Sequence, residues 1–188
     1  STLQDALNKA TAAGKMAFVD CYTEYCGPCK TMVALVFTLD SVADFFNSNF
    51  VNVKLDMLSE DGKQYADKYK IGAYPSFLLL NGKGELLYKF VGGKSADVFM
   101  AEIRKGMKPD NRVKSMDDTY ATGKYSNDFL REYVQLKLQL LEKGESLRLG
   151  KEYFDKISPE ERLQPENWFL FADRTLGGIN STNMRCLL

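Results

Sequence analysis

The chain has 188 residues, 45% of them hydrophobic, and its 25 basic residues balance its 25 acidic residues. A balanced charge gives no reason to expect nucleic acid or an anionic membrane surface as a partner. No apolar run approaches the length that a membrane-spanning helix needs. The length is sufficient for one large domain or two small ones.

Helical and strand patterns alternate through the first half of the chain. Their periodicity and the glycines between them predict helix 3–13, strand 16–22, a helix through 37, a short helix 38–47, strand 50–56, helix 60–69, strands 76–81 and 85–91, and helix 96–106. The glycine-rich turn at 82–84 joins the last two strands as a hairpin. A mixed sheet covered by helices is an α/β sandwich, which is the fold class that we expect.

The second half of the chain shows no strand pattern. The segment Lys108-Pro109-Asp110-Asn111 has the composition of a linker, and helices are predicted at 125–143, 145–157 and 165–176, the first of them ended by Gly144. We therefore expect two parts, residues 1–107 and an all-helical extension, residues 108–188. Residues 120–143 and 145–157 weakly resemble one tetratricopeptide-like hairpin, which is too little for a solenoid. A helical cap is one interpretation, and a platform for a protein or substrate is the other.

The most informative motif is Cys26-Gly27-Pro28-Cys29, directly after a predicted buried strand. A Cys-x-x-Cys in this position favours a redox dithiol, because a zinc site needs a second pair of ligands. The chain has no histidine, and its other cysteines, Cys21 and Cys186, are isolated. Half of a metal site and a structural staple remain the alternatives. We expect no metal and no organic cofactor.

The position of Cys26 explains the chemistry. At the first turn of a helix, unpaired backbone N–H groups and the positive helix end stabilise a thiolate. Pro28 suits that first turn, where its missing N–H is not needed. Cys29 lies one turn further and can close a disulfide. Cys26 is thus the predicted nucleophile and Cys29 the resolving thiol.

Asp20 lies inside the apolar strand, on the same face as Phe18 and Tyr22 by alternation. Burial should raise the pKa of its carboxyl group and make it an acid or base near neutral pH. The alternative is an aspartate at a strand end that faces solvent. By the same alternation, Cys21 points to the other face of the strand. The favoured interpretation is a buried thiol that packs as a small apolar side chain, and a regulatory thiol is the alternative. Lys54 by itself is typical of a solvated lysine on an edge strand.

These residues resemble a known family. Residues 19–30 are similar to the active-site segment of thioredoxins and their thioredoxin-like relatives, and Ala73-Tyr74-Pro75-Ser76 resembles their cis-proline loop. Residues 53–56 look like the third strand of the family, and residues 91–93 like its late glycine turn. The resemblance covers about residues 1–107 and implies a thioredoxin-like α/β sandwich.

The resemblance also implies roles for individual residues. Asp20 would help to move the proton of the resolving thiol, with Lys54 beside it, and substrate backbone would pair next to Tyr74. The catalytic residues that it implies are Cys26, Cys29, Asp20 and Lys54. The substrate-binding residues that it implies are Tyr25, Gly27, Pro28, Tyr74, Pro75 and Gly92.

The sequence departs from the family pattern near the dithiol. Tyr25 stands where a tryptophan usually precedes the first cysteine, and residues 30–37 lack the usual mid-helix proline. With the second short helix, this layout looks more like thioredoxin-like domains of cell-envelope thiol:disulfide interchange proteins. The chain also begins at Ser1, which suggests a processed or trimmed product. A bacterial cell envelope (periplasm) is therefore the favoured compartment, and the cytoplasm is the alternative.

The predicted function is a thiol:disulfide oxidoreductase that reduces protein disulfides through a mixed disulfide. Its partners would be disulfide-containing proteins and an upstream reductase that supplies electrons. Two alternatives remain. One is oxidation or isomerisation of disulfides in the cell envelope, although Gly27-Pro28 resembles the reducing members. The other is a binding module whose helical tail carries the function.

Overall fold

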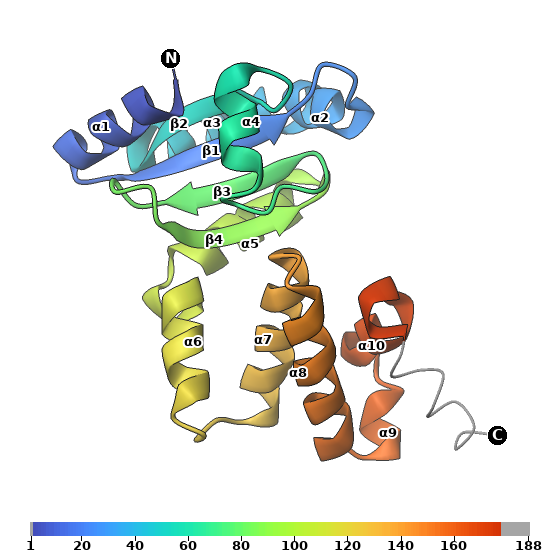
Figure 1. The fold of residues 1–188 in the computed structure, drawn as a ribbon. Helices are drawn as coiled ribbons and strands as arrows, with labels where there is room; N and C mark the ends of the chain where they lie inside the picture. Colours follow the sequence, from blue (N-terminus) through green and yellow to red (C-terminus); the bar gives the residue numbers. More distant parts are fainter. Residues whose placement is uncertain (1, 178–188) are drawn as a thin grey trace. The chain divides into compact units, whose positions relative to one another are not determined.

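The computed structural model describes residues 2–177 and divides between Ser115 and Met116 into two compact units (Figure 1). Cys186 lies outside the described residues. Each unit is described by itself. Within the described residues, no helix has both the length and the apolar character needed to cross a membrane.

The first unit is built on a mixed four-stranded sheet with the order β2-β1-β3-β4. The central strand β1 (Met16–Tyr22) runs parallel to β2 (Phe50–Asp56) and antiparallel to β3 (Ser76–Leu80). The last strand, β4 (Leu86–Val91), pairs antiparallel with β3. The predicted mixed sheet and thioredoxin-like α/β fold are confirmed.

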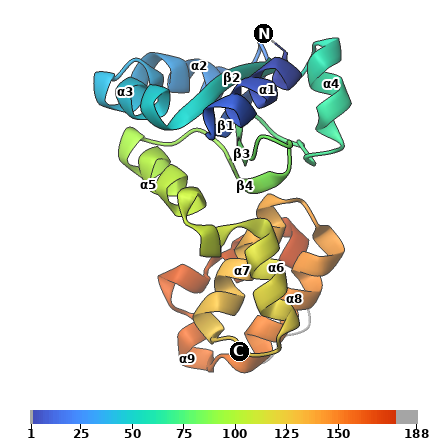
Figure 2. The ribbon, with the colours of Figure 1, turned by 90° about the vertical axis from the view of Figure 1, so that its left-hand side faces the viewer.

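Helices cover both faces of this sheet (Figure 2). One face packs on α1 (Leu3–Ala13) and α4 (Glu60–Ala66). The other face packs on α2 (Gly27–Met32), the π-helix η1 (Val33–Phe37), α3 (Asp40–Asn49) and α5 (Ala96–Met107).

Strand alternation separates the two cores. On β1, Val19 and Cys21 pack into the core beneath α1 and α4, whereas Phe18 points into the opposite core. That second core is aromatic: the ring of Phe18 lies 4.6 Å from the ring of Phe46 and 6.1 Å from that of Phe99, measured between centroids. The face that receives Phe18 also receives Asp20, two residues on, so the carboxyl group lies on the side of the dithiol helix.

Two predicted helices differ from the structure in the first unit. The helix expected over 60–69 ends at Ala66, and the chain then turns through Lys70, whose φ is 50°. The helix expected through residue 37 changes from α to π after Met32. A π-helix is a local widening that is frequent at functional sites, and here it occupies the stretch without the usual proline.

The second unit is all-helical, as predicted, but its boundaries differ. Its helices are α6 (Val113–Ala121), which begins just before the division, α7 (Asn127–Gln139), α8 (Lys143–Lys156), α9 (Pro159–Arg162), η3 (Pro165–Asn167), α10 (Phe169–Ala172) and η4 (Arg174–Leu176). No helix was predicted at α6, in which Met116 is the single buried residue. The predicted helix 165–176 is three short pieces.

The pair α7 and α8 packs together as a hairpin. The left-handed residue between the helices is Leu141, with φ of 59°, whereas Gly144 lies in the first turn of α8 and does not end α7. The buried Lys137 ammonium group contacts the carboxylates of Asp117 at 2.7 Å and Glu142 at 3.3 Å. These ion pairs hold α7 against neighbouring segments of the unit.

Candidate redox site

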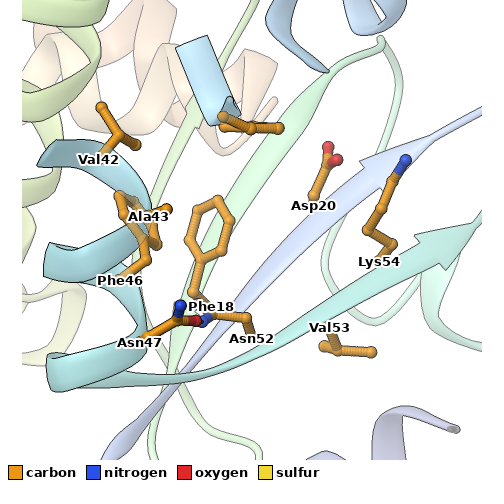
Figure 3. A pocket seen from close by; sticks show the side chains of 10 residues that line it. Phe18, Asp20, Val42, Ala43, Phe46, Asn47, Asn52, Val53 and Lys54 are labelled. Carbon is orange, nitrogen blue, oxygen red and sulfur yellow. The ribbon is translucent and has the colours of Figure 1, made fainter. Parts of the chain in front are cut away.

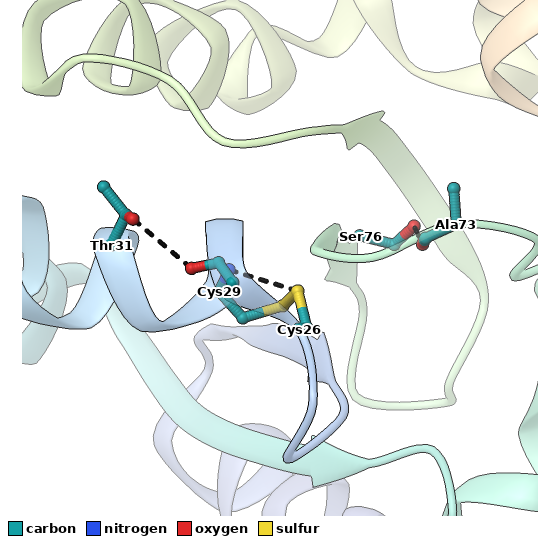
Figure 4. The surroundings of a disulfide bond; sticks show 6 residues. Cys26, Cys29, Thr31, Ala73 and Ser76 are labelled. Atoms are coloured by element: carbon teal, nitrogen blue, oxygen red, sulfur yellow. Dashed lines mark hydrogen bonds between the residues drawn. A yellow bond between two sulfur atoms is a disulfide. The ribbon is translucent and has the colours of Figure 1, made fainter.

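Cys26 and Cys29 form a disulfide at the start of α2 (Figure 4), with 5.3 Å between their Cα atoms. Cys26 is the N-cap residue of the helix, and its sulfur accepts the backbone N–H of Cys29 at 3.1 Å. Cys26 is half-buried, whereas only 5% of Cys29 is exposed. The less buried residue, Cys26, is the one that an incoming disulfide can meet more readily.

The helix start favours a thiolate on Cys26 after reduction. An N-cap sulfur faces N–H groups that no carbonyl oxygen satisfies, and the positive end of the helix dipole adds to their effect. Such an environment lowers the pKa of a cysteine below its ordinary value of about 8.5. Pro28 occupies the first turn without leaving a donor unused.

Asp20 is a buried carboxyl group on β1, only 3% exposed. Its Oδ1 atom accepts no hydrogen bond from any described residue. Burial raises the pKa of Asp20 to about 6, and the positive charge of Lys54 opposes this rise. The two residues are register partners on β1 and β2, and both side chains extend to the same side of the sheet (Figure 3).

A cavity of about 360 Å³ connects Asp20 to the dithiol. Asp20, Lys54 and Cys29 all line it, together with Tyr22, Thr23, Glu24, Lys30, Val33 and Ala34. Asp20 also borders a second cavity of about 230 Å³, walled by Phe18, Phe37, Val42 and Phe46 (Figure 3). The carboxyl group and Cys29 thus border the same cavity, whose wall also includes the exposed Glu24 and Lys30.

The cis-proline loop reaches the dithiol through the glycine turn. The Tyr74–Pro75 peptide bond is cis, and the Pro75 carbonyl oxygen accepts the N–H of Gly92 at 2.9 Å. A Cβ atom built on the neighbouring Gly93 would lie 3.4 Å from the Cβ atom of Pro28. Pro75, the glycine turn and the dithiol loop therefore lie next to one another.

Gly27, Tyr25 and Tyr74 complete the predicted site. Gly27 is exposed at the first position of α2, and its carbonyl oxygen accepts the Thr31 hydroxyl at 3.3 Å (Figure 4). Tyr25 precedes the dithiol with 80% of its surface exposed, and Tyr74 is also exposed. Asp20 and the exposed Lys54 line the cavity that Cys29 also lines. Tyr25, Gly27 and Pro28 are exposed and adjoin Cys26 in the chain.

Two neighbours of the site were not singled out from the sequence. The ring of Tyr22 lies under the Lys54 ammonium group, 4.4 Å from its centroid. Alternation from Asp20 was the signal that could have identified it. The Met32 sulfur accepts the backbone N–H of Lys94 at 3.3 Å, and no local sequence signal indicates that contact.

Cys21 is fully buried on the opposite face of β1. Burial raises the pKa of its thiol to about 12, and the charge of Asp20 adds to the rise. A thiol with so high a pKa stays protonated and unreactive. Among the described residues, no group of three or more histidine, cysteine or acidic side chains is arranged to hold a metal ion.

Comparison with known proteins gives the family. Residues 3–106 match the model of the Thioredoxin-like domain, and the chain belongs to that family. It is 34% identical over 94 residues to Thioredoxin Y1, chloroplastic, of Arabidopsis thaliana, a match that covers 50% of this chain and 51% of that protein. It is 24% identical over 118 residues to a protein disulfide-isomerase of Zea mays, covering 62% of this chain and 23% of the maize protein.

A solved structure is also similar. The putative disulphide-isomerase from Bacteroides thetaiotaomicron superposes with a TM-score of 0.54 at 39% identity, covering 57% of this chain and 89% of the other. Residues 3–106 are thus a Thioredoxin-like domain with a Cys26–Cys29 disulfide, and the chain spans about half or less of the length of the Arabidopsis and maize relatives.

Proposed function

We propose that this protein reduces disulfide bonds of protein substrates. The observation that carries the proposal is the asymmetry of the dithiol. Cys26 is accessible and accepts a backbone N–H at a helix start, whereas Cys29 is buried and shares a cavity with the buried Asp20. One sulfur is thus suited to attack and the other to resolve.

In the first step, the Cys26 thiolate attacks one sulfur of the substrate disulfide. The substrate S–S bond breaks, one substrate thiolate leaves, and a mixed disulfide joins Cys26 to the other sulfur. The substrate backbone lies in extended form beside Tyr74, next to the cis peptide bond. The exposed Tyr25, Gly27 and Pro28 and the half-buried Gly92 would contact the substrate near the reacting sulfur.

In the second step, Cys29 loses its proton to the Asp20 carboxylate and attacks Cys26. The mixed disulfide breaks, the Cys26–Cys29 bond forms, and the second substrate thiolate leaves and takes up a proton. A carboxyl group with a pKa of about 6 is roughly nine-tenths ionised at pH 7. Asp20 can therefore accept the proton at neutral pH, and Lys54 helps to keep it ionised.

In total, the two steps transfer two electrons from the protein dithiol to the substrate disulfide. An upstream dithiol reductase then returns two electrons to Cys26 and Cys29. The direction rests on Gly27-Pro28 between the cysteines and on the similarity to a thioredoxin. The similarity to proteins named disulfide isomerases supports the opposite direction, oxidation or rearrangement of disulfides, as the second candidate.

The test is the reduction of insulin by dithiothreitol, followed by turbidity. The native protein should accelerate the reaction, Cys26→Ser should lose the acceleration, and Cys29→Ser should accumulate the mixed disulfide. Cys21→Ala is the matched control, because that thiol lies on the other face of β1, and it should keep the native rate. A Cys26→Ser variant that still accelerates the reaction would overturn the proposal.

A further inference from the structure

The second cavity beside Asp20 has no part in the proposed reaction. It has a volume of about 230 Å³, and most of its wall comes from β1, η1 and α3 (Figure 3). Phe18, Val42 and Phe46 are buried in that wall, and Phe37 is half-buried. An apolar cavity of about 150 Å³ is enough to hold a benzene molecule. The cavity in this protein therefore has room for one aromatic ring with a short substituent.

The apolar wall contains one buried polar group, the carboxyl group of Asp20. This residue is only 3% exposed, and its Oδ1 atom accepts no hydrogen bond from any described residue. Lys54 lines the same cavity, but its ammonium group lies over the ring of Tyr22, 4.4 Å from the centroid. A buried acceptor without a donor costs free energy. A ligand that brings one donor to Oδ1 removes that cost.

The cavity reaches the protein surface between α3 and β2. The exposed residues in its lining are Asn47 on α3 and Asn52 and Lys54 on β2. The side-chain amide of Asn52 donates to the side-chain oxygen of Asn47 at 3.3 Å. Neither Cys26 nor Cys29 lines this cavity. A ligand can therefore enter it from solvent without passing the dithiol.

The charges around the cavity select a neutral ligand. Among the described residues, Asp20 and Lys54 are the charged side chains that line it, and their charges are opposite. A cationic ligand would meet the charge of Lys54, an anionic ligand would meet that of Asp20, and either would lose its hydration among phenylalanine rings. A hydroxyl group donates a hydrogen bond to the carboxylate and brings no charge.

We infer that this cavity is a binding site for a small apolar molecule with one hydroxyl group, which donates its hydrogen bond to Oδ1 of Asp20. The apolar part of the ligand, about the size of one aromatic ring, packs against Phe18, Val42 and Phe46. This inference concerns binding alone, so it does not depend on the proposed function or on its direction.

The test compares two probes of equal size, benzyl alcohol and ethylbenzene, which differ by a hydroxyl group in place of a methyl group. Each probe is titrated into the oxidised protein. The dissociation constant is obtained by NMR from the shifts of the Val42 methyl signals, because this residue lies in the cavity wall. Benzylammonium serves as the cationic third probe.

The native protein should bind benzyl alcohol about tenfold more tightly than ethylbenzene, which is the effect of one hydrogen bond to a charged acceptor. Benzylammonium should bind more weakly than benzyl alcohol. Asp20→Leu removes the acceptor but keeps a side chain of similar size. It should therefore lose the preference for the alcohol and still bind ethylbenzene.

A cavity-filling variant shows whether the probes bind at this position. Ala43 is a half-buried residue of α3 that lines the cavity, so Ala43→Leu should weaken the binding of both probes. Ala101→Leu is the matched control, because Ala101 is an exposed helical alanine on α5 outside the lining. It should bind both probes as the native protein does.

Equal dissociation constants of the native protein for the alcohol and the hydrocarbon would overturn the inference, as would the absence of a Val42 shift with either. Tighter binding of benzylammonium would contradict a neutral ligand. Because these three comparisons use the native protein, the inference stays testable even if Asp20→Leu or Ala43→Leu fails to fold. None of these outcomes bears on insulin reduction, which tests the proposed function separately.

Discussion

Asp20 and Lys54 are register partners on the parallel strands β1 and β2, and both line the cavity behind Cys29. Burial raises the pKa of Asp20, and the positive charge of Lys54 limits the rise, so that the value settles at about 6. The Lys54 ammonium group also lies over the ring of Tyr22. The pair therefore holds a buried carboxyl group at the pKa that proton transfer near neutral pH requires.

Asp20→Asn should stabilise the oxidised protein at pH 8. The folded pKa of about 6 lies above the ordinary value of 3.8, so between these values the folded protein holds a proton that the unfolded chain has lost. Stability from this proton is full below about pH 4 and is lost as pH rises through 6. This difference of about two pKa units corresponds to about 3 kcal/mol, which is the largest increase in the free energy of unfolding that Asp20→Asn can give at pH 8.

Urea unfolding at pH 4.5, 6 and 8 measures this effect. The free energy of unfolding of the native protein should fall as the pH rises from 4.5 to 8, and that of Asp20→Asn should fall less. Asp44→Asn, an exposed aspartate on α3, is the control and should follow the native protein. The same pH dependence in native protein and Asp20→Asn would contradict a raised pKa at Asp20.

Lys54→Met should raise the pKa of Asp20 above about 6, because it removes the charge that favours the carboxylate. Carbon-13 NMR titration of the Asp20 carboxyl group measures the change directly. Lys83→Met, in the β3–β4 hairpin, serves as the control and should leave that titration in place. A fall of the Asp20 pKa in Lys54→Met would show that the lysine does not act through its charge.

Cys21 should resist alkylation in the folded protein. Its thiol is fully buried and its pKa is raised to about 12, so iodoacetamide at pH 8 finds no thiolate there. After reduction, peptide mass spectrometry should find the label on Cys26 within minutes and on Cys21 only after denaturation. Rapid labelling of Cys21 in the folded protein would instead support a regulatory thiol.

Gly62→Ala should destabilise the first unit by about 1–3 kcal/mol, the usual cost of overpacking a well-packed site. A Cβ atom at this position would clash with the Asp56 carbonyl oxygen, and backbone cannot move aside as a flexible side chain can. Thermal unfolding of Gly62→Ala and of Lys63→Ala, an exposed neighbour on α4, gives the comparison. Equal unfolding temperatures of the two variants would contradict the prediction, because they would show that α4 can move away from β2 without loss of stability.

The fold of the first unit follows closely from local patterns. Strands β1 and β2 begin and end where alternation predicts, and α1 ends at Gly14, whose φ of 63° a glycine adopts without strain. The π-helix η1 could not be predicted, because its backbone depends on how Val36 and Phe37 pack into the aromatic core. In the second unit, α6 has one buried residue, which is too few to mark a buried helical face in the sequence.

The candidate site was predictable in part. The Cys-x-x-Cys spacing and the position of Asp20 in an apolar strand indicate the reacting groups directly. The cis bond before Pro75 and the contact of Gly93 with Pro28 depend on loops brought together by the sheet. Residue patterns alone do not contain that proximity, and the family resemblance supplied it for Pro75.

The reduction potential of the Cys26–Cys29 pair tests the proposed direction most directly. The protein is equilibrated with thiol–disulfide buffers of known potential, and its free thiols are alkylated and counted against the Cys26→Ser variant. A reductase predicts a value near about −270 mV. A value near about −120 mV would contradict the proposal and identify an oxidant of protein thiols.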